Sequence, residues 1–253
     1  MKILLKIAYL GTAYCGYQVQ PNGVTVQQRL GEAAKAVFGF ECDIVGCSRT
    51  DSGVHARGFR ATVTQKGTDT LDTTVPVERI PRALNVHLPS DISVLDATVV
   101  ADDFHARYSV VSKEYEYLIY NGPERDPFLG DRAWHIGKRF DDRAVAQMNE
   151  AASVFVGRRD FTALRDGDPD EKDPVREVFA ASVTKRGDMI SFRVRADGFL
   201  YHMVRVMTGA LVEVGRGKLT PAELAEHIKA KNRKACGATA PACGLYLDRV
   251  FYQ

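Results

Sequence analysis

The chain has 253 residues, of which 45% are hydrophobic and 26% are charged. This ordinary globular composition suits one sizeable domain or two half-domains, and it excludes a disordered or fibrous protein. The formal net charge of +2 does not indicate a polyanion partner, so a basic binding surface would have to be local.

The sequence shows no sign of a membrane segment, a secretory signal or a metal centre. Its apolar runs, such as residues 3–5 and 210–212, are far shorter than the roughly 20 residues that span a bilayer. The N-terminus enters a predicted strand without a cleavage-type site, so we expect a cytoplasmic protein. The five cysteines are odd in number and include no Cys-x-x-Cys pair, which disfavours a disulfide framework or structural zinc.

Apolar periodicity and turn residues predict the order strand-helix-strand-strand-helix-strand in the first half of the chain. The strands are predicted at residues 2–9, 42–47, 56–65 and 92–100. Thr25 and Gln28 form a capping-box pattern at the start of the first helix, which Gly39 ends. Residues 77–84 predict a short second helix that Pro81 interrupts.

The second half repeats that order. Its strands are predicted at residues 115–120, 177–185, 189–196 and 244–251. The middle two flank a tight turn at Gly187, which is typical of a hairpin. Asp141 is the predicted N-cap of one helix, residues 203–214 form the most apolar helix, and Thr220 with Glu223 begins another with a capping box.

Two units of this order in tandem predict an α+β protein made of two ferredoxin-like (βαββαβ) halves. We expect the halves to comprise residues 1–112 and 113–253, with residues 121–130 as the best candidate linker. Edge-to-edge sheets would form one extended, mostly antiparallel sheet with helices on one side and a cleft at the junction.

The stretch GCSRTDSGVHARG gathers Arg49, Asp51 and His55 within seven residues, just past a predicted strand. Asp-Ser-Gly is common turn chemistry, and Arg49 beside Asp51 is equally consistent with a weak surface ion pair. His55 is more often a scaffold residue than a general acid in such a position. Taken alone, this stretch leaves both a structural and a catalytic interpretation open.

Three further segments favour a site. In KEYEYLIY, Tyr115 and Tyr117 share one strand face, where they serve either as core aromatics or as stacking surfaces for a nucleobase. In GFLYHMVR, Arg205 lies in the first turn of the apolar helix, which is a rigid mount for a guanidinium. In APACGLYLDRV, Leu245 or Leu247 faces either a pocket or the core.

These segments resemble the signature motifs of the TruA family of tRNA pseudouridine synthases. The resemblance rests on RTDSGVHA, KEYEY, GFLYHMVR and APACGLYL in that order, with GTAYCGYQVQ, TVQQRL and DDFHARYS in support. It covers essentially the whole chain. It implies an isomerase without a cofactor that acts on uridines 38, 39 and 40 in the anticodon arm of tRNA, as a homodimer.

The resemblance also implies roles for individual residues. Asp51 is the nucleophile, which attacks the uracil ring or the sugar C1′ carbon, after which the base rotates and reattaches through C5. Arg205 pairs with Asp51, and Tyr115 stacks on the base and stands near C5. Arg49 holds the target nucleotide out of the stack. Apart from these implied roles, Arg107, in DFHARYS, is a candidate for a phosphate contact, although an ordinary surface position is also open.

Physical chemistry accounts for the pairing of Asp51 with an arginine. A closed cleft raises the pKa of a carboxyl group by desolvation, yet the nucleophile must be ionised. A bidentate guanidinium opposes that shift and orients one carboxylate oxygen toward the base.

Two positions depart from the family pattern. Ser48 stands where the family usually has Gly before Arg-Thr-Asp, and Leu10 stands where Tyr-Asp-Gly-Thr would supply an aspartate. Neither departure removes a catalytic group, although the second puts in doubt any contact that the missing acid makes.

Other functions remain open from the residues alone. One is a hydrolase in which Asp51 forms an ester and His55 activates water, although no second carboxylate or metal cluster supports it. Another is a non-catalytic RNA-binding module or tRNA folding chaperone.

The basic cluster in KAKNRKACG, formed by Lys229, Lys231, Arg233 and Lys234, is equally consistent with a solvated helix end. With tRNA as partner, its part near Lys231 and Arg233 fits a strip that contacts phosphates, with an affinity that falls with salt.

Overall fold

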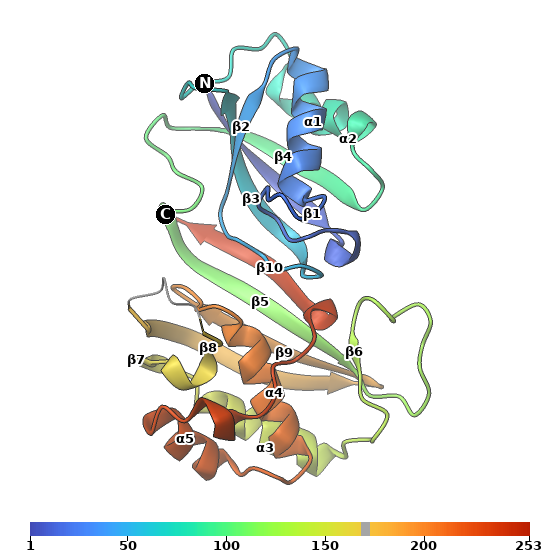
Figure 1. Cartoon of the computed structure of the whole chain (residues 1–253), viewed down its shortest axis with the longest axis vertical. Coiled ribbons are helices and arrows are strands. Elements are labelled where there is room, and N and C mark those ends of the chain that lie inside the picture. The colour runs from blue at the N-terminus through green and yellow to red at the C-terminus, as the bar shows by residue number, and fades with distance from the viewer. Residues whose placement is uncertain (168–172) are drawn as a thin grey trace. The chain divides into compact units, whose positions relative to one another are not determined.

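The computed structural model describes residues 1–167 and 173–253 of the chain. It folds as two compact units, which are coloured along the chain in Figure 1. Unit 1 comprises residues 1–111 and 246–253, and unit 2 comprises residues 112–245. None of the helices in the described ranges is long and apolar enough to cross a bilayer.

Unit 1 has the element order and strand order of a ferredoxin-like half. Its elements are β1 (Lys2–Tyr9), α1 (Val26–Phe38), β2 (Cys42–Gly46), β3 (His55–Gln65), α2 (Ile80–His87) and β4 (Ile92–Val100). Antiparallel pairing gives the order β4-β1-β3-β2. The last strand, β10 (Leu245–Tyr252), adds a short parallel pairing at the start of β3. Helices α1 and α2 pack against each other, as Figure 1 shows.

The helix boundaries of unit 1 follow from capping chemistry. The Thr25 side chain accepts a hydrogen bond from the Gln28 backbone N–H at 3.3 Å, and Gly39 ends α1 in the left-handed region with φ of 81°. The Gln28 side chain instead donates to Glu32, so only half of the predicted capping box forms.

The predicted helix over residues 77–84 is a 3₁₀ turn at Val77–Arg79 that continues directly into α2 at Ile80. Pro81 lies in the first turn of α2, where no backbone N–H is needed, so the predicted interruption is a change from 3₁₀ to α-helix rather than a break.

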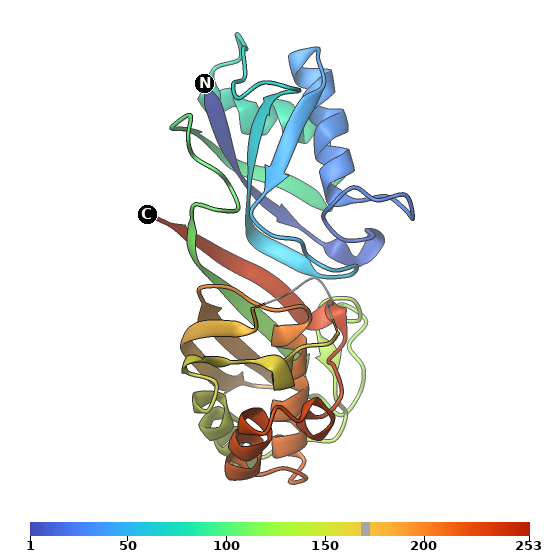
Figure 2. The same ribbon diagram turned by 60° about the vertical axis from the view of Figure 1, so that its left-hand side comes forward.

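Unit 2 has an antiparallel sheet in the order β5-β9-β8-β7. Its strands are β5 (Val110–Tyr120), β6 (Trp134–His135), β7 (Gly157–Asp160), β8 (Val175–Arg186) and β9 (Met189–Ala196). Its helices are α3 (Asp142–Ser153), α4 (Met203–Gly215) and α5 (Pro221–Lys229). Helix α3 packs against β8, α4 and α5, and Figure 2 shows these helices gathered beside the strands of their unit.

Local predictions for unit 2 are confirmed. Strands β8 and β9 form a hairpin in which Arg186 pairs with Met189 around Gly187, whose φ is 58°. Thr220 and Glu223 form the complete capping box at the start of α5. Helix α4 is buried along nearly its whole length, as its apolar pattern predicts. Short strands β6 and β7, which have little periodicity of their own, were not predicted.

The mixed α+β class with mostly antiparallel pairing is thus confirmed. The predicted half-boundary between residues 112 and 113 lies beside the boundary between the units. Residues 246–253, which the sequence assigns to the second half, belong to unit 1. Residues 121–130 lie inside unit 2, between β5 and β6, so the linker prediction was wrong. The shared sheet and central cleft stay predictions.

Candidate active site

The loop that carries Asp51 lies between β2 and β3 and is held by the segment that follows β1. The hydroxyls of Tyr9 and Thr50 are hydrogen-bonded at 2.8 Å, and the Tyr17 N–H donates to the Thr50 carbonyl at 3.2 Å. Within the loop, the Val54 N–H donates to the Asp51 carbonyl at 3.2 Å. The backbone around the proposed nucleophile is therefore built into unit 1 from both sides.

Two glycines of GTAYCGYQ allow this close fit. A Cβ atom at Gly11 would lie 2.0 Å from the Val54 carbonyl oxygen, and one at Gly16 would lie 2.6 Å from the Thr50 carbonyl oxygen. Real Cβ atoms do not approach oxygen so closely, so both positions require glycine. The N-terminal motif and the Arg-Thr-Asp motif are thus two parts of one structure.

His55 lies at the start of β3 and is completely buried. Its Nδ1 atom accepts a hydrogen bond from the Gly11 N–H at 2.9 Å, and its ring packs against Tyr246 with centroids 4.7 Å apart. These contacts support the scaffold interpretation of His55. They weaken the hydrolase hypothesis, which needs this imidazole to reach a water molecule.

Arg49 and Arg107 line one pocket of about 250 Å³ in unit 1. Arg49 follows β2, and Arg107 belongs to the loop between β4 and β5. Both side chains are exposed. The structure therefore brings together the two arginines that the sequence nominates for RNA contacts, although they are 58 residues apart in the chain (107 minus 49).

In unit 2, Tyr115 and Tyr117 share one face of β5, as the alternation predicts. Tyr115 is only 7% exposed, and its ring meets Phe199 edge to face with centroids 5.0 Å apart. Tyr117 is fully buried, and its hydroxyl donates to the Pro241 carbonyl at 2.7 Å. Tyr117 is a core residue, and Tyr115 lies on the same face nearer the start of the strand.

Arg205 lies in the first turn of α4 and is tied to the segment before β10. Its Nε atom donates to the Ala240 carbonyl at 2.7 Å, and the Ala240 N–H donates to the Arg205 carbonyl at 3.1 Å. Because Pro241 accepts the Tyr117 hydroxyl, residues 240–241 join the helix that carries Arg205 to the strand that carries Tyr115. Leu245, at the start of β10, is 6% exposed.

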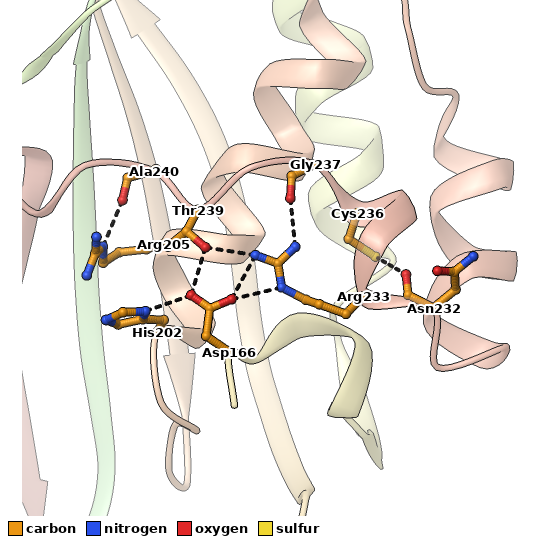
Figure 3. A network of polar contacts seen from close by, with 9 residues as sticks. All are labelled: Asp166, His202, Arg205, Asn232, Arg233, Cys236, Gly237, Thr239 and Ala240. Carbon is orange, nitrogen blue, oxygen red and sulfur yellow. Dashed lines mark hydrogen bonds and ion pairs between the residues drawn. The ribbon is translucent and has the colours of Figure 1, made fainter. Parts of the chain in front are cut away.

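A polar network centred on Asp166 surrounds the start of α4, as Figure 3 shows. The Asp166 carboxylate is 2.7 Å from Nδ1 of His202 and accepts a hydrogen bond from Thr239 Oγ1 at 2.8 Å. It also accepts two hydrogen bonds from the Arg233 guanidinium, at 2.9 and 3.1 Å. This one carboxylate connects three chain segments that meet at the helix of Arg205.

The network also explains an unusual backbone conformation. His202, the N-cap of α4, has φ of 58°, which is uncommon for a residue other than glycine. Its bond to Asp166 holds it there. Burial raises the pKa of Asp166, but the hydrogen bonds from His202, Thr239 and Arg233 outweigh that effect and hold the pKa below its usual value.

The predicted phosphate strip at Lys231 and Arg233 is not supported. All three guanidinium nitrogens of Arg233 donate within the protein, the third to the Gly237 carbonyl. Lys231 forms an ion pair with Asp160 at 2.6 Å. Sequence analysis missed Asp166 because its partners are distant in the chain, and in the sequence it is only the first acid of the acid-rich stretch DGDPDEKD.

The six candidate residues thus fall into two groups. Arg49, Asp51 and Arg107 belong to unit 1, whereas Tyr115, Arg205 and Leu245 belong to unit 2. The pairing of Asp51 with Arg205 stays a prediction because it joins residues of the two units.

Comparison with a family model shows the class of protein to which the chain belongs. A family model described as tRNA pseudouridine synthase matches residues 6–109 and 151–253, which include Arg49, Asp51 and Arg205. These matched segments contain the loop between β2 and β3 and the whole of α4. The class of protein is therefore an RNA-modifying isomerase.

Relatives that match over the full length give the same result. Proteins named tRNA pseudouridine synthase A from Thermoanaerobacter sp. (strain X514) and Moorella thermoacetica are 39% and 43% identical, with 99% and 98% of each chain covered. The Bacillus pumilus protein of that name is 42% identical over 254 aligned positions, covering 100% of this chain and 99% of the relative. The chain belongs to the tRNA pseudouridine synthase family.

Among solved structures, a chain from a Cbf5-Nop10-Gar1 complex matches at 14% identity with a TM-score of 0.35, covering 96% of this chain and 57% of that one. This similarity is too low to support a conclusion about function.

Proposed function

We propose that this protein converts uridines 38, 39 and 40 in the anticodon arm of tRNA to pseudouridine, with Asp51 as nucleophile and without a cofactor. The observation that carries the proposal is the complete Arg-Thr-Asp loop, held by Gly11, Gly16 and Thr50 in a chain of this family. The relatives named tRNA pseudouridine synthase A match over the whole chain, which favours the catalytic function over a non-catalytic RNA-binding module.

The reaction needs no atom from outside the substrate. The Asp51 carboxylate attacks either C6 of the ring or C1′ of the sugar, and the bond between N1 and C1′ breaks. The base rotates, C5 bonds to C1′, and the C5 proton leaves so that the ring regains its double bond while N1 is protonated. Tyr115 stands near C5 for this proton transfer, and the departure of Asp51 completes the isomerisation.

The remaining residues bind and orient. Arg205, mounted on the buried helix α4 and tied to Ala240, keeps Asp51 ionised in a site that excludes water. Arg49 holds the target nucleotide out of the stack. Arg107 contacts an RNA phosphate, and Leu245 packs on the uracil. We also propose that the protein acts in the cytoplasm as a homodimer.

Substitution of the nucleophile tests the proposal. We expect Asp51→Ala to abolish pseudouridine formation on an unmodified tRNA transcript, because no other carboxylate replaces it, while tRNA affinity stays within about threefold. Pseudouridine is measured by chemical mapping, and affinity is measured by filter binding. Asp69→Ala, at an exposed aspartate of unit 1, is the matched control and should retain full activity.

Two outcomes would contradict the proposal. One is pseudouridine formation by Asp51→Ala at the unsubstituted rate. The other is turnover of small esters by the unsubstituted protein in the absence of RNA, which would indicate a hydrolase.

A further inference from the structure

Tyr108 is an exposed aromatic residue that the proposed reaction does not use. Its side chain is 77% exposed. It lines the same pocket of unit 1 as Arg49 and Arg107. An exposed tyrosine forms a binding surface only where its backbone is held in place.

The backbone on either side of Tyr108 is held by His105. Nδ1 of His105 accepts hydrogen bonds from the N–H groups of Arg107 and Tyr108, at 3.1 and 3.2 Å. The Ser109 N–H donates to the His105 carbonyl at 3.0 Å, and the Ser109 hydroxyl accepts from the His105 N–H at 3.1 Å. One residue thus closes a tight turn around Tyr108.

This turn is also anchored to the sheet of unit 1. Ala106 is fully buried, and its carbonyl accepts a hydrogen bond from the Tyr252 hydroxyl at 2.8 Å. The ring of Tyr252 also packs against Phe104, with centroids 4.9 Å apart. Lys2 donates to the Phe104 carbonyl at 3.2 Å. The ring of Tyr108 is therefore presented from a rigid base, although it is itself in solvent.

The Tyr108 ring has two neighbouring side chains but lies mostly in solvent. The His105 ring lies against it at a centroid distance of 4.3 Å and an angle of 35°. With 77% of the residue exposed, this contact leaves most of the ring in solvent. The Arg107 guanidinium carbon lies 5.8 Å from the ring centroid, so a cation flanks the stacking surface.

A rigid aromatic face beside two arginines matches the chemistry of an unpaired nucleotide. Its base stacks on an aromatic ring, and its phosphate pairs with a guanidinium.

The position of the pocket indicates which nucleotide it takes. Arg49 lines the pocket and is two residues from Asp51, so this site adjoins the proposed nucleophile within unit 1. We infer that Tyr108 stacks on the base of a nucleotide next to the target uridine, while Arg107 binds its phosphate. This inference rests on the proposed function, since it takes tRNA as the ligand.

The test measures the affinity of the full chain for an unmodified tRNA transcript, in an Asp51→Ala background so that the RNA is not turned over. Because a base loses its stacking partner when the ring is removed, Tyr108→Ala should weaken binding by about fivefold or more. Tyr108→Phe should bind like the parent because it keeps the ring. Tyr108→Leu, which keeps apolar volume without a π face, should be as weak as alanine.

Modified RNAs locate the contact. Two synthetic tRNAs are used, one with an abasic nucleotide on the 5′ side of the target uridine and one with it on the 3′ side. With one of these RNAs, the parent and the Tyr108→Ala protein should bind with equal affinity. Phe128→Ala is the matched control, because Phe128 is a loop aromatic of unit 2 with 83% exposure, and it should not change affinity.

Three results with the protein variants would overturn the inference: no loss of affinity in Tyr108→Ala, equal affinities of the Tyr108→Leu and Tyr108→Phe proteins, or a loss in Phe128→Ala as large as that in Tyr108→Ala. With the modified RNAs, it would be overturned if the effect of Tyr108→Ala on affinity persisted with both of them. A change of oligomeric state in Tyr108→Ala, seen by sedimentation, would also overturn it and assign the ring to an interface between copies. Pseudouridine formation by the protein with native Asp51 is measured in parallel, and its absence would instead contradict the proposed function.

Discussion

Single atoms decide how the Asp51 loop is built. Gly11 cannot carry a Cβ atom because that atom would lie 2.0 Å from the Val54 carbonyl oxygen. Gly31, by contrast, lies inside α1, and a Cβ atom there would have no neighbouring atom within 4 Å outside its own helix backbone. The same substitution at these two glycines should therefore have opposite effects.

We expect Gly11→Ala to lower the free energy of unfolding by about 1–3 kcal/mol, as overpacking does, and to reduce pseudouridine formation because it displaces the loop. Gly31→Ala should raise that free energy by about 0.5–1 kcal/mol, because alanine favours a helix. Urea unfolding and activity at saturating tRNA measure both effects. A Gly11→Ala protein as stable and active as its parent would show that the loop is not held by this contact.

At the scale of elements, Arg205 depends on how α4 meets its neighbours. The helix is held by its buried apolar face, and its start is held by the Asp166 carboxylate, which accepts hydrogen bonds from Arg233 and Thr239 and lies 2.7 Å from Nδ1 of His202. We therefore propose that Asp166 is a positioning residue for Arg205 rather than a group that touches the substrate.

We expect Asp166→Ala to lower kcat about tenfold while tRNA affinity changes little, because Arg205 loses orientation but not charge. Asp160→Ala, which breaks the ion pair with Lys231, is the matched control and should keep kcat. A fall in affinity with unchanged kcat in Asp166→Ala would contradict a positioning role.

The acid side of the stability profile checks the same network. Since the pKa of Asp166 is lower in the folded protein than in the unfolded chain, its contribution is present above the unfolded pKa of about 3.9. It is lost as pH falls through the folded pKa. Asp166→Asn should therefore lose less stability than the parent when pH drops from about 5 to below 3.9.

At the scale of the whole molecule, the net charge is only +2, so a surface that binds tRNA must be a local cluster of basic residues. The structure distinguishes two kinds of arginine. Arg107 is exposed beside a pocket, whereas the nitrogens of Arg233 all donate within unit 2. Only an exposed arginine such as Arg107 can pair with an RNA phosphate and so release the counterions bound to it.

We expect Arg107→Ala to reduce the slope of log affinity against log salt by about one. Arg233→Ala should leave that slope unchanged and instead lower the melting temperature, because it leaves Asp166 without its cation. Filter binding across about 50–200 mM salt and thermal unfolding measure the two effects. An unchanged slope in Arg107→Ala would remove this residue from the phosphate-binding surface.

The sequence by itself determined what depends on near neighbours in the chain. Strand alternation, the Thr25 and Thr220 caps, the hairpin at Gly187 and the burial of α4 all follow from bonds and periodicities that span a few residues. The resemblance to the family's motifs also sufficed to nominate Asp51, Tyr115 and Arg205, and their chemistry explains why these residue types are needed.

Only the tertiary structure decided which side chains have partners and which face solvent. Asp166 and Arg233 are 67 residues apart, so no local pattern could show that a predicted phosphate ligand is consumed by an internal ion pair. The same is true of three other features: the pocket that Arg49 and Arg107 both line, the burial of His55, and the exposure of Tyr108 on a rigid turn. Each depends on long-range packing, whose energy is set by the whole fold rather than by any one segment.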